Sequence, residues 1–170
     1  MMRTNINIAA PLAALSFLIC ATAGHSATRS GTSRTTVLDQ LTITNTAGLD
    51  FGRIVASTTA GTVTINPTTG VRTRTGGATL AGGTPSVARF IVTGTENRIV
   101  TITGATGAIT LSNGTGGTMT VNTFRLNGAR NRRLSAAGTV TIQVGARLNV
   151  RANQASGIYN GTFNVTVNYQ

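Results

Sequence analysis

The stretch Gly157–Gln170, GIYNGTFNVTVNYQ, decides the fold class of this chain. From Phe163 onward its residues alternate strictly, with apolar side chains at odd positions and Asn or Thr at even positions. Successive side chains of a β-strand point to opposite faces, so the alternation predicts a strand with one buried and one solvated face. Most domains fray at their last residues, whereas this pattern continues to the penultimate Tyr169. We therefore expect this strand to have a role that needs its tip intact.

Outward from this strand, the chain beyond residue 30 consists of short β-rich runs with no helical period. Gly, Asn and Pro separate the runs, and Asn-Gly pairs supply the positive φ that tight hairpins require. Many short strands without intervening helices predict an antiparallel sandwich. The predicted strands cover residues 36–44, 49–56, 61–66, 71–75, 86–93, 98–103, 108–112, 118–126, 139–150 and 158–169.

Two of the predicted strands contain an irregularity. The apolar alternation over 118–126 changes phase before Phe124, which predicts a β-bulge near Asn122-Thr123. Gly145 interrupts the long run over 139–150 and predicts a kink there. Repeated Thr-x-Thr motifs suggest a remote alternative, a β-solenoid like those of ice-binding proteins. A solenoid needs a fixed sequence period, and this chain has none.

The first residues predict a secretory signal peptide. Arg3 is positively charged, residues 8–20 are apolar, and small residues follow. The apolar run is too short to span a membrane as a helix, and cleavage is expected after Ala23 or as late as Ala27. The predicted organisation is a signal peptide over 1–23, an N-terminal extension over 24–36 and one β-sandwich domain over 37–170. We expect an exported protein without disulfides, because cleavage removes Cys20, the only cysteine.

The charge of the chain is strongly basic. Its 14 basic residues are all arginines, against three acids. Nucleic acid is not the expected partner, because aromatic residues make up only 4% of the chain and a stacking platform needs more. A basic surface suits an anionic setting such as a polysaccharide. The arginines are scattered singly except for Arg130, Arg132 and Arg133, which we expect to lie in one loop as a candidate anion patch.

The residues that catalysis commonly uses are sparse and scattered. The only histidine, His25, lies at the predicted cleavage junction, and the three acids are far apart in sequence. No Ser-His-Asp set, paired carboxylate or metal-ligand spacing is present. The sequence therefore predicts a protein that is not an enzyme and that has no cofactor or metal.

Gly157 is the fourteenth residue from the end of the sequence and Tyr169 the second. A glycine and a penultimate tyrosine so placed, joined by an alternating strand, resemble the C-terminal signature of chaperone–usher pilus subunits. The mature chain also resembles a secreted bacterial domain-of-unknown-function family, the one numbered 4402, which is pilin-like. The stretches that carry this resemblance are Leu49–Gly52, Gly61–Ile65, Gly82–Ser86, Thr118–Val121 and Ala152–Gly157.

The resemblance implies an immunoglobulin-like antiparallel β-sandwich that is incomplete and is finished by a donated strand. It also implies a periplasmic chaperone, an outer-membrane usher and self-association into a surface fibre that serves adhesion. The acceptor strand would use Gly157, Phe163, Val165, Val167 and Tyr169. The candidate donor would use Thr28, Ser30, Thr32, Arg34 and Thr36, or a later register through Val37, Leu41 and Ile43.

Several alternatives stay open at this point. For residues 28–36 there are three alternatives: donation to a neighbouring subunit, folding back on their own domain, or a disordered leader. Shaft and tip subunits are not distinguished, nor is the surface to which a fibre would adhere. The alternative function is a monomeric secreted or surface β-sandwich that binds anionic polysaccharide through its arginines.

Overall fold

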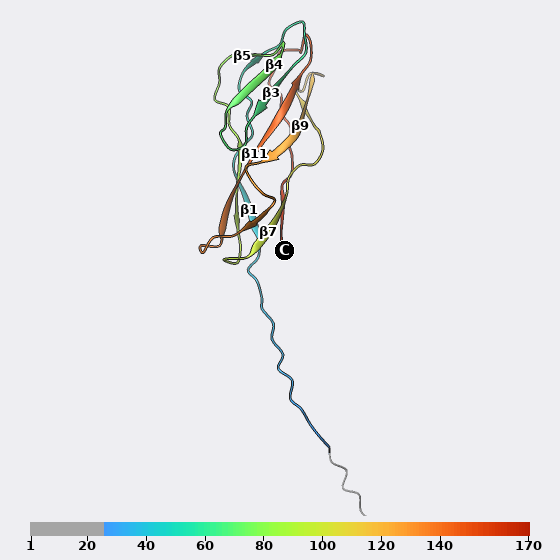
Figure 1. Cartoon of the computed structure of the whole chain (residues 1–170). Helices are drawn as coiled ribbons and strands as arrows, with labels where there is room; N and C mark the ends of the chain where they lie inside the picture. Colours follow the sequence, from blue (N-terminus) through green and yellow to red (C-terminus); the bar gives the residue numbers. More distant parts are fainter. Residues whose placement is uncertain (1–25) are drawn as a thin grey trace, which may run out of the picture. The chain divides into compact units, whose positions relative to one another are not determined.

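A computed structural model of the chain describes residues 26–170. The predicted signal peptide, cleavage after Ala23, Cys20 and His25 lie outside the described residues. The chain divides into a unit that ends at Thr35 and a second unit, Thr36–Gln170. Residues 26–35 are exposed and have no regular secondary structure, whereas the second unit contains every strand of the described part (Figure 1).

Residues 26–170 form twelve strands and no helix, so no helix there could cross a membrane. The strands are β1 (Thr42–Ala47), β2 (Ile54–Val55), β3 (Gly61–Ile65), β4 (Arg72–Gly76), β5 (Thr79–Leu80), β6 (Ala88–Thr93), β7 (Ile99–Thr103), β8 (Ile109–Ser112), β9 (Thr118–Leu126), β10 (Asn131–Arg133), β11 (Thr139–Val150) and β12 (Thr166–Tyr169). Every strand pair is antiparallel. The predicted all-β antiparallel sandwich is therefore confirmed, and the solenoid alternative is wrong.

Several predicted strand bounds are wrong. The first strand begins at Thr42 instead of residue 36, and the predicted strand over 49–56 is reduced to β2. The last strand begins at Thr166 instead of residue 158, because the backbone of residues 158–165 pairs with a neighbouring strand only at the bridge between Asn160 and Ser112. Strands β5 and β10 were not predicted from the sequence. Alternation alone shows which side chains share a face, but a strand also needs a partner backbone.

The strands form a seven-stranded sheet and two smaller sheets. The seven-stranded sheet follows the order β1-β6-β11-β3-β4, with β9 and then β8 on the other edge of β11. The smaller sheets have the orders β10-β7-β12 and β2-β5. The twelve-residue strand β11 runs along the length of the domain (Figure 1). Its first half pairs with β6 and its second half with β3, so β11 joins the two ends of the sandwich.

The two predicted irregularities meet at the point where β11 changes partner. The ladder between β9 and β11 shifts register between Gly145 and Arg147, where two residues of β9 oppose one of β11. Thr123 lies in this bulge with a φ of 54°. Gly145 lies against the β3–β4 turn, and a Cβ there would be 2.2 Å from the carbonyl oxygen of Ile65. The predicted bulge is confirmed, whereas the predicted kink at Gly145 stays a prediction, because the extra residue lies in β9 and β11 is continuous from Thr139 to Val150.

The apolar side chains form two clusters, one on each half of β11. The first, here called the β3 core, contains Phe51, Val63, Ile65, Ala78, Met119, Val121, Ala146, Leu148 and Val150. The second, here called the β7 core, contains Ala88, Val92, Val100, Ile102, Leu134, Ile142 and Val144. The terminal strand β12 packs against the β7 core, so this half of the domain contains the candidate functional edge.

Candidate functional site

The terminal strand β12 is an edge strand. It pairs with β7 from Thr166 opposite Thr103 to Tyr169 opposite Val100. The backbone N–H of Gln170 also donates to the carbonyl of Ile99, at 3.0 Å, so hydrogen bonding continues past the last residue of β12. No strand of the described residues pairs with the other edge of β12, which leaves a row of backbone donors and acceptors available.

The inner face of the terminal segment is only partly covered. The predicted alternation is confirmed, since Phe163, Val165, Val167 and Tyr169 are half-buried against the β7 core and the residues between them are exposed. The facing core residues Val92 and Ile102, in contrast, have no exposed surface. The inward side chains of the terminal segment therefore keep exposed apolar surface beside a fully buried core.

Phe163 is one of two aromatic side chains on this inner face. Its ring packs edge-on against Phe90, with centroids 6.1 Å apart, and tilted against Phe124, with centroids 5.0 Å apart. The edge-on arrangement with Phe90 is one that aromatic pairs prefer. Phe163 also lines a hollow of about 430 Å³ between the β7–β8 connection and residues 162–166. Open space therefore lies directly beside the terminal segment.

The hydroxyl of Tyr169 joins the terminal strand to the segment that precedes β1. It donates to the carbonyl of Asp39 at 2.9 Å and accepts from the backbone N–H of Thr95 at 2.7 Å. The N–H of Asp39 donates to Thr95 Oγ1 at 2.6 Å. A Cβ on Gly94 would be 2.3 Å from the hydroxyl oxygen, so the close approach requires glycine there. Within the described chain β1 pairs only with β6, so it is an edge strand like β12. The hydrogen bond of Tyr169 to Asp39 therefore joins β12 to the segment that leads into β1.

Gly157, the remaining candidate of the acceptor strand, lies outside β12. It is exposed in the connection from β11, with a φ of 148° that favours glycine. A Cβ there would be 3.1 Å from the Cβ of Asn113 in the β8–β9 turn. Gly157 therefore belongs to a turn, separate from the four side chains that face the β7 core.

The candidate donor residues fall into two groups. Thr28, Ser30, Thr32, Arg34 and Thr36 are exposed, and Val37 is 89% exposed. Leu41 instead packs against the β7 core, and Ile43 lies in β1 opposite Val92. The later register through Leu41 and Ile43 would remove both residues from their own domain. The two groups therefore differ in burial: the residues up to Val37 are exposed, whereas Leu41 and Ile43 belong to the packing and pairing of their own domain.

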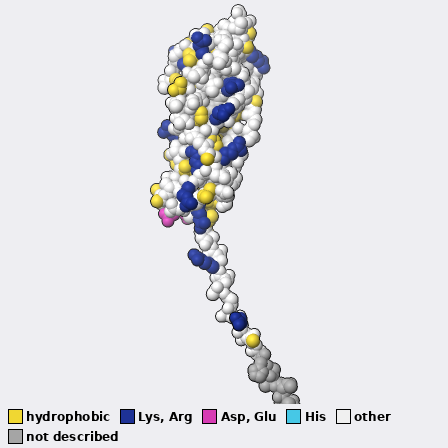
Figure 2. Space-filling view, viewed as in Figure 1, with side chains coloured by type: hydrophobic (Ala, Val, Ile, Leu, Met, Phe, Trp, Pro, Cys, Tyr) yellow, Lys and Arg dark blue, Asp and Glu magenta, His cyan; other side chains and the backbone are white. Residues whose placement is uncertain are grey.

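The predicted arginine patch is not a loop. Arg132 and Arg133 lie in β10, where neighbouring side chains point to opposite faces, and only Arg130 precedes the strand. Arg133 donates to the carbonyl of Asn97 at 3.1 Å. Figure 2 shows arginine side chains scattered over the visible face of the domain. The predicted single loop is therefore wrong, and β10 was missed because the sequence does not show that residues 131–133 pair with β7.

Arg132 has a structural role at the edge of β11. Its guanidinium donates to the carbonyls of Ala129 and Thr141, both at 3.0 Å, and to Asn127 Oδ1 at 2.8 Å. Removal from solvent lowers the pKa of this guanidinium from its ordinary value. These bonds join the β9–β10 connection to the part of β11 that β9 does not cover.

We expect Arg132→Gln to destabilise the domain by about 2 kcal/mol, because it removes hydrogen bonds made by a charged donor. Urea unfolding followed by circular dichroism measures this difference. Arg130→Gln is the matched control, since Arg130 is exposed and the change in charge is the same. Equal midpoints for the two variants would contradict the structural role of Arg132.

The fold and the edge define a class of protein: an all-β antiparallel sandwich whose last strand is unpaired along one side within the described chain. The sequence matches the family described as domain of unknown function DUF4402 over residues 41–169, and the chain belongs to that family. The match begins just before β1 and ends at Tyr169, so it includes both β1 and β12. Comparisons with curated proteins and with solved structures gave no match.

Proposed function

We propose that the protein is an exported structural subunit of a surface fibre, a pilus or fimbria, that assembles by β-strand donation. The observation that carries this proposal is the terminal segment, which combines an unpaired backbone edge with a half-covered apolar face. Strand addition to a sheet edge provides both missing parts, since the added backbone pairs with the edge and its alternate side chains cover the apolar face. A periplasmic chaperone and an outer-membrane usher are the proposed assembly partners.

The proposed donor is the segment from Thr28 to Val37 of a neighbouring subunit. Its residues are exposed and have no regular secondary structure, so they are available to another chain. Most of its side chains are Thr, Ser or Arg, and small β-branched residues suit a shallow site on a strand. Thr28, Ser30, Thr32, Arg34 and Thr36 share one face of the segment when it is extended.

A second candidate function is a monomeric secreted or surface sandwich that binds anionic polysaccharide. Exposed arginines away from the terminal edge support it, because a charged sugar needs such donors. The two candidates make different demands on the terminal edge. A fibre subunit needs the edge to accept a strand, whereas a monomer does not.

The first test deletes residues 28–36 and adds a synthetic peptide that spans Thr28–Leu38. We expect the deleted subunit not to polymerise and to remain bound by its chaperone. The peptide should raise the thermal midpoint of the deleted subunit in a concentration-dependent way, because a ligand of the folded state stabilises it by mass action. Differential scanning fluorimetry measures the midpoint, and electron microscopy follows polymerisation.

Two further peptides serve as controls. The same peptide with proline at positions 32, 34 and 36 lacks the backbone donors of a strand and should have no effect. A longer peptide that ends at Thr44 tests the later register, with Leu41 and Ile43 changed to Asp in a parallel sample. The fibre proposal fails if the deleted subunit is a stable monomer without chaperone and no peptide changes its melting.

A further inference from the structure

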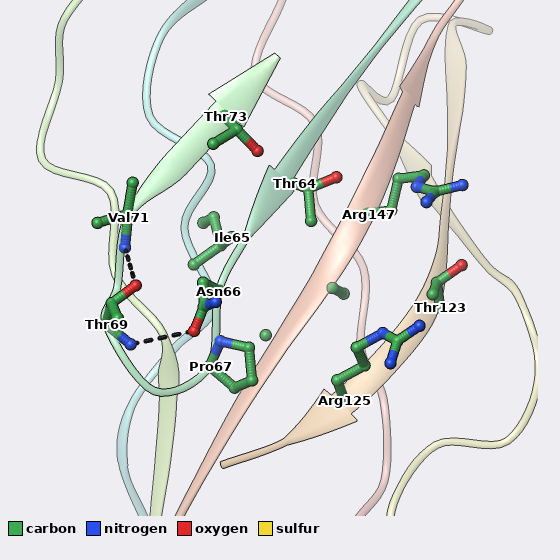
Figure 3. Close-up of a pocket in the computed structure, with 12 residues that line it drawn as sticks. Thr64, Ile65, Asn66, Pro67, Thr69, Val71, Thr73, Thr123, Arg125 and Arg147 are labelled. Carbon is green, nitrogen blue, oxygen red and sulfur yellow. Dashed lines mark hydrogen bonds between the residues drawn. The ribbon is translucent and has the colours of Figure 1, made fainter. Parts of the chain in front are cut away.

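A second hollow lies beside the middle of β11, where this strand changes partner from β6 to β3. It has a volume of about 470 Å³, in the range typical of small-molecule sites. Its walls come from the β3–β4 turn and from the bulged part of β9 and β11 (Figure 3). The residues that matter for the argument are Pro67, Val71, Thr73, Thr123, Arg125 and Arg147.

The bulge brings the polar side chains of this hollow to one face. Arg147 lies opposite Asn122 and Gly145 opposite Arg125, so the extra residue of β9 lies between these two pairs. In Figure 3 the guanidinium groups of Arg125 and Arg147 both point towards the β9 side, where Thr123 lies. If the residues of β9 alternated strictly from Val121 onward with no bulge, Arg125 would lie on the same face as Val121, inside the sandwich.

Thr123 is the strained residue of the hollow. Its φ of 54° is rare for a β-branched side chain, because the Cβ is too close to the backbone in this region. Strain of this kind persists where the surrounding structure imposes it and is often found at functional sites. At Thr123 the strained conformation belongs to the bulge that directs Arg125 outward.

The opposite wall is held rigidly by the β3–β4 turn. Asn66 Oδ1 accepts from the N–H of Thr68 at 2.8 Å and from that of Thr69 at 3.1 Å. Thr69 Oγ1 accepts from the N–H of Val71 at 3.3 Å. Pro67 lies so close to Gly145 that a Cβ there would be 2.8 Å from the proline nitrogen. A wall fixed in this way loses little conformational freedom when a ligand binds.

The charge of the hollow is positive. Arg125 and Arg147 are exposed, and none of the residues that line the hollow carries a carboxylate. Arg72, Arg74 and Arg133 differ from them, because their guanidinium groups donate to backbone carbonyls of the domain. Guanidinium groups that the fold does not use in this way are available to an anion, and Arg binds a carboxylate through two parallel hydrogen bonds.

We propose that this hollow binds a carboxylate-bearing sugar residue of an acidic polysaccharide, with Arg125 and Arg147 on the carboxylate. Thr73 and Thr123 offer hydroxyl groups to the sugar, and Pro67 and Val71 offer an apolar surface to its C–H groups. The hollow has no aromatic lining residue on which a nucleic-acid base could stack. This proposal rests on the second candidate function, the binding of anionic polysaccharide, and gives that function a binding site. A subunit of a surface fibre could contain the same site.

The test titrates the purified protein with tri-galacturonate, by calorimetry at about 0.15 M salt, where isolated surface charges are largely screened. We expect saturable binding of one trisaccharide and no binding of the neutral maltotriose. The double variant Arg125→Gln/Arg147→Gln should bind at least about tenfold more weakly, as expected for the loss of charge-assisted bonds. Arg53→Gln/Arg98→Gln is the matched control, since both residues are exposed, lie outside the hollow and remove the same charge.

Three results would overturn the proposal: no binding to wild type, equal weakening by both double variants, or tighter binding of a sulfated trisaccharide than of tri-galacturonate. The single variant Arg147→Gln replaces the double variant if the latter does not fold. Thr123→Gly adds an independent readout, because it should raise the thermal midpoint by relieving strain and weaken binding several-fold. If the Thr123→Gly protein bound tri-galacturonate with unchanged affinity, the proposed contact between Thr123 and the sugar would be wrong. These variants leave the terminal edge intact, so peptide-induced stabilisation tests the fibre proposal separately.

Discussion

Tyr169→Ala is expected to destabilise the domain by about 3 kcal/mol. Truncating a packed aromatic ring leaves a cavity beside the β7 core, and the hydroxyl takes its two hydrogen bonds with it. For a domain of this size the thermal midpoint should fall by roughly 10 °C. Thermal unfolding followed by circular dichroism measures the change, and in cells the variant should accumulate at a lower level.

Tyr169→Phe separates the contribution of the ring from that of its hydroxyl, and a substitution at Asn168 serves as the control. Tyr169→Phe keeps the packing and leaves the N–H of Thr95 and the carbonyl of Asp39 without their partner, so we expect a loss of about 1 to 2 kcal/mol. Asn168→Ala is the matched control on the exposed face of the same strand and should be close to neutral. Gln143→Ala would be a poorer control, because the Gln143 side chain is half-buried and contacts the side-chain amide of Asn127. Equal stability of the Asn168→Ala and Tyr169→Ala proteins would contradict the role of Tyr169.

Gly145→Ala is expected to destabilise the domain by about 3 kcal/mol, at the upper end of the cost of overpacking. A Cβ at this position would meet the carbonyl oxygen of Ile65 at 2.2 Å and the nitrogen of Pro67 at 2.8 Å. Both atoms belong to the backbone, so no side chain can rotate away. The β3–β4 turn would have to move off β11 at the point where that strand joins the two cores.

Gly107→Ala is the matched control for Gly145→Ala. Gly107 is exposed in the β7–β8 connection, and a Cβ there would have no neighbour within 4 Å. We expect the control to be within about 0.5 kcal/mol of wild type in urea unfolding, as for most surface substitutions. A Gly145→Ala protein as stable as the Gly107→Ala protein would show that the turn does not need its close approach to β11. The same displacement should weaken sugar binding, because Pro67 lines the proposed site.

The sequence by itself determined the features that depend on local side-chain pattern. The alternation from Phe163 to Tyr169 correctly separated the half-buried positions from the exposed ones. The phase change before Phe124 located the bulge in β9. These features could be predicted because the side-chain period of a strand is two, and an extra residue must break it.

Only the tertiary structure decided how these strands use their edges and polar groups. Arg132 donates to carbonyls of two separate segments, and the hydroxyl of Tyr169 meets Asp39, 130 positions earlier in the chain. Leu41 and Ile43 have apolar side chains that would suit a donor, yet they pack and pair within their own domain. Local pattern shows which face a side chain occupies, but not which strand lies beside it. That choice depends on how the whole chain buries its apolar surface and pairs its backbone, so the partners of each edge emerge only from the assembled fold.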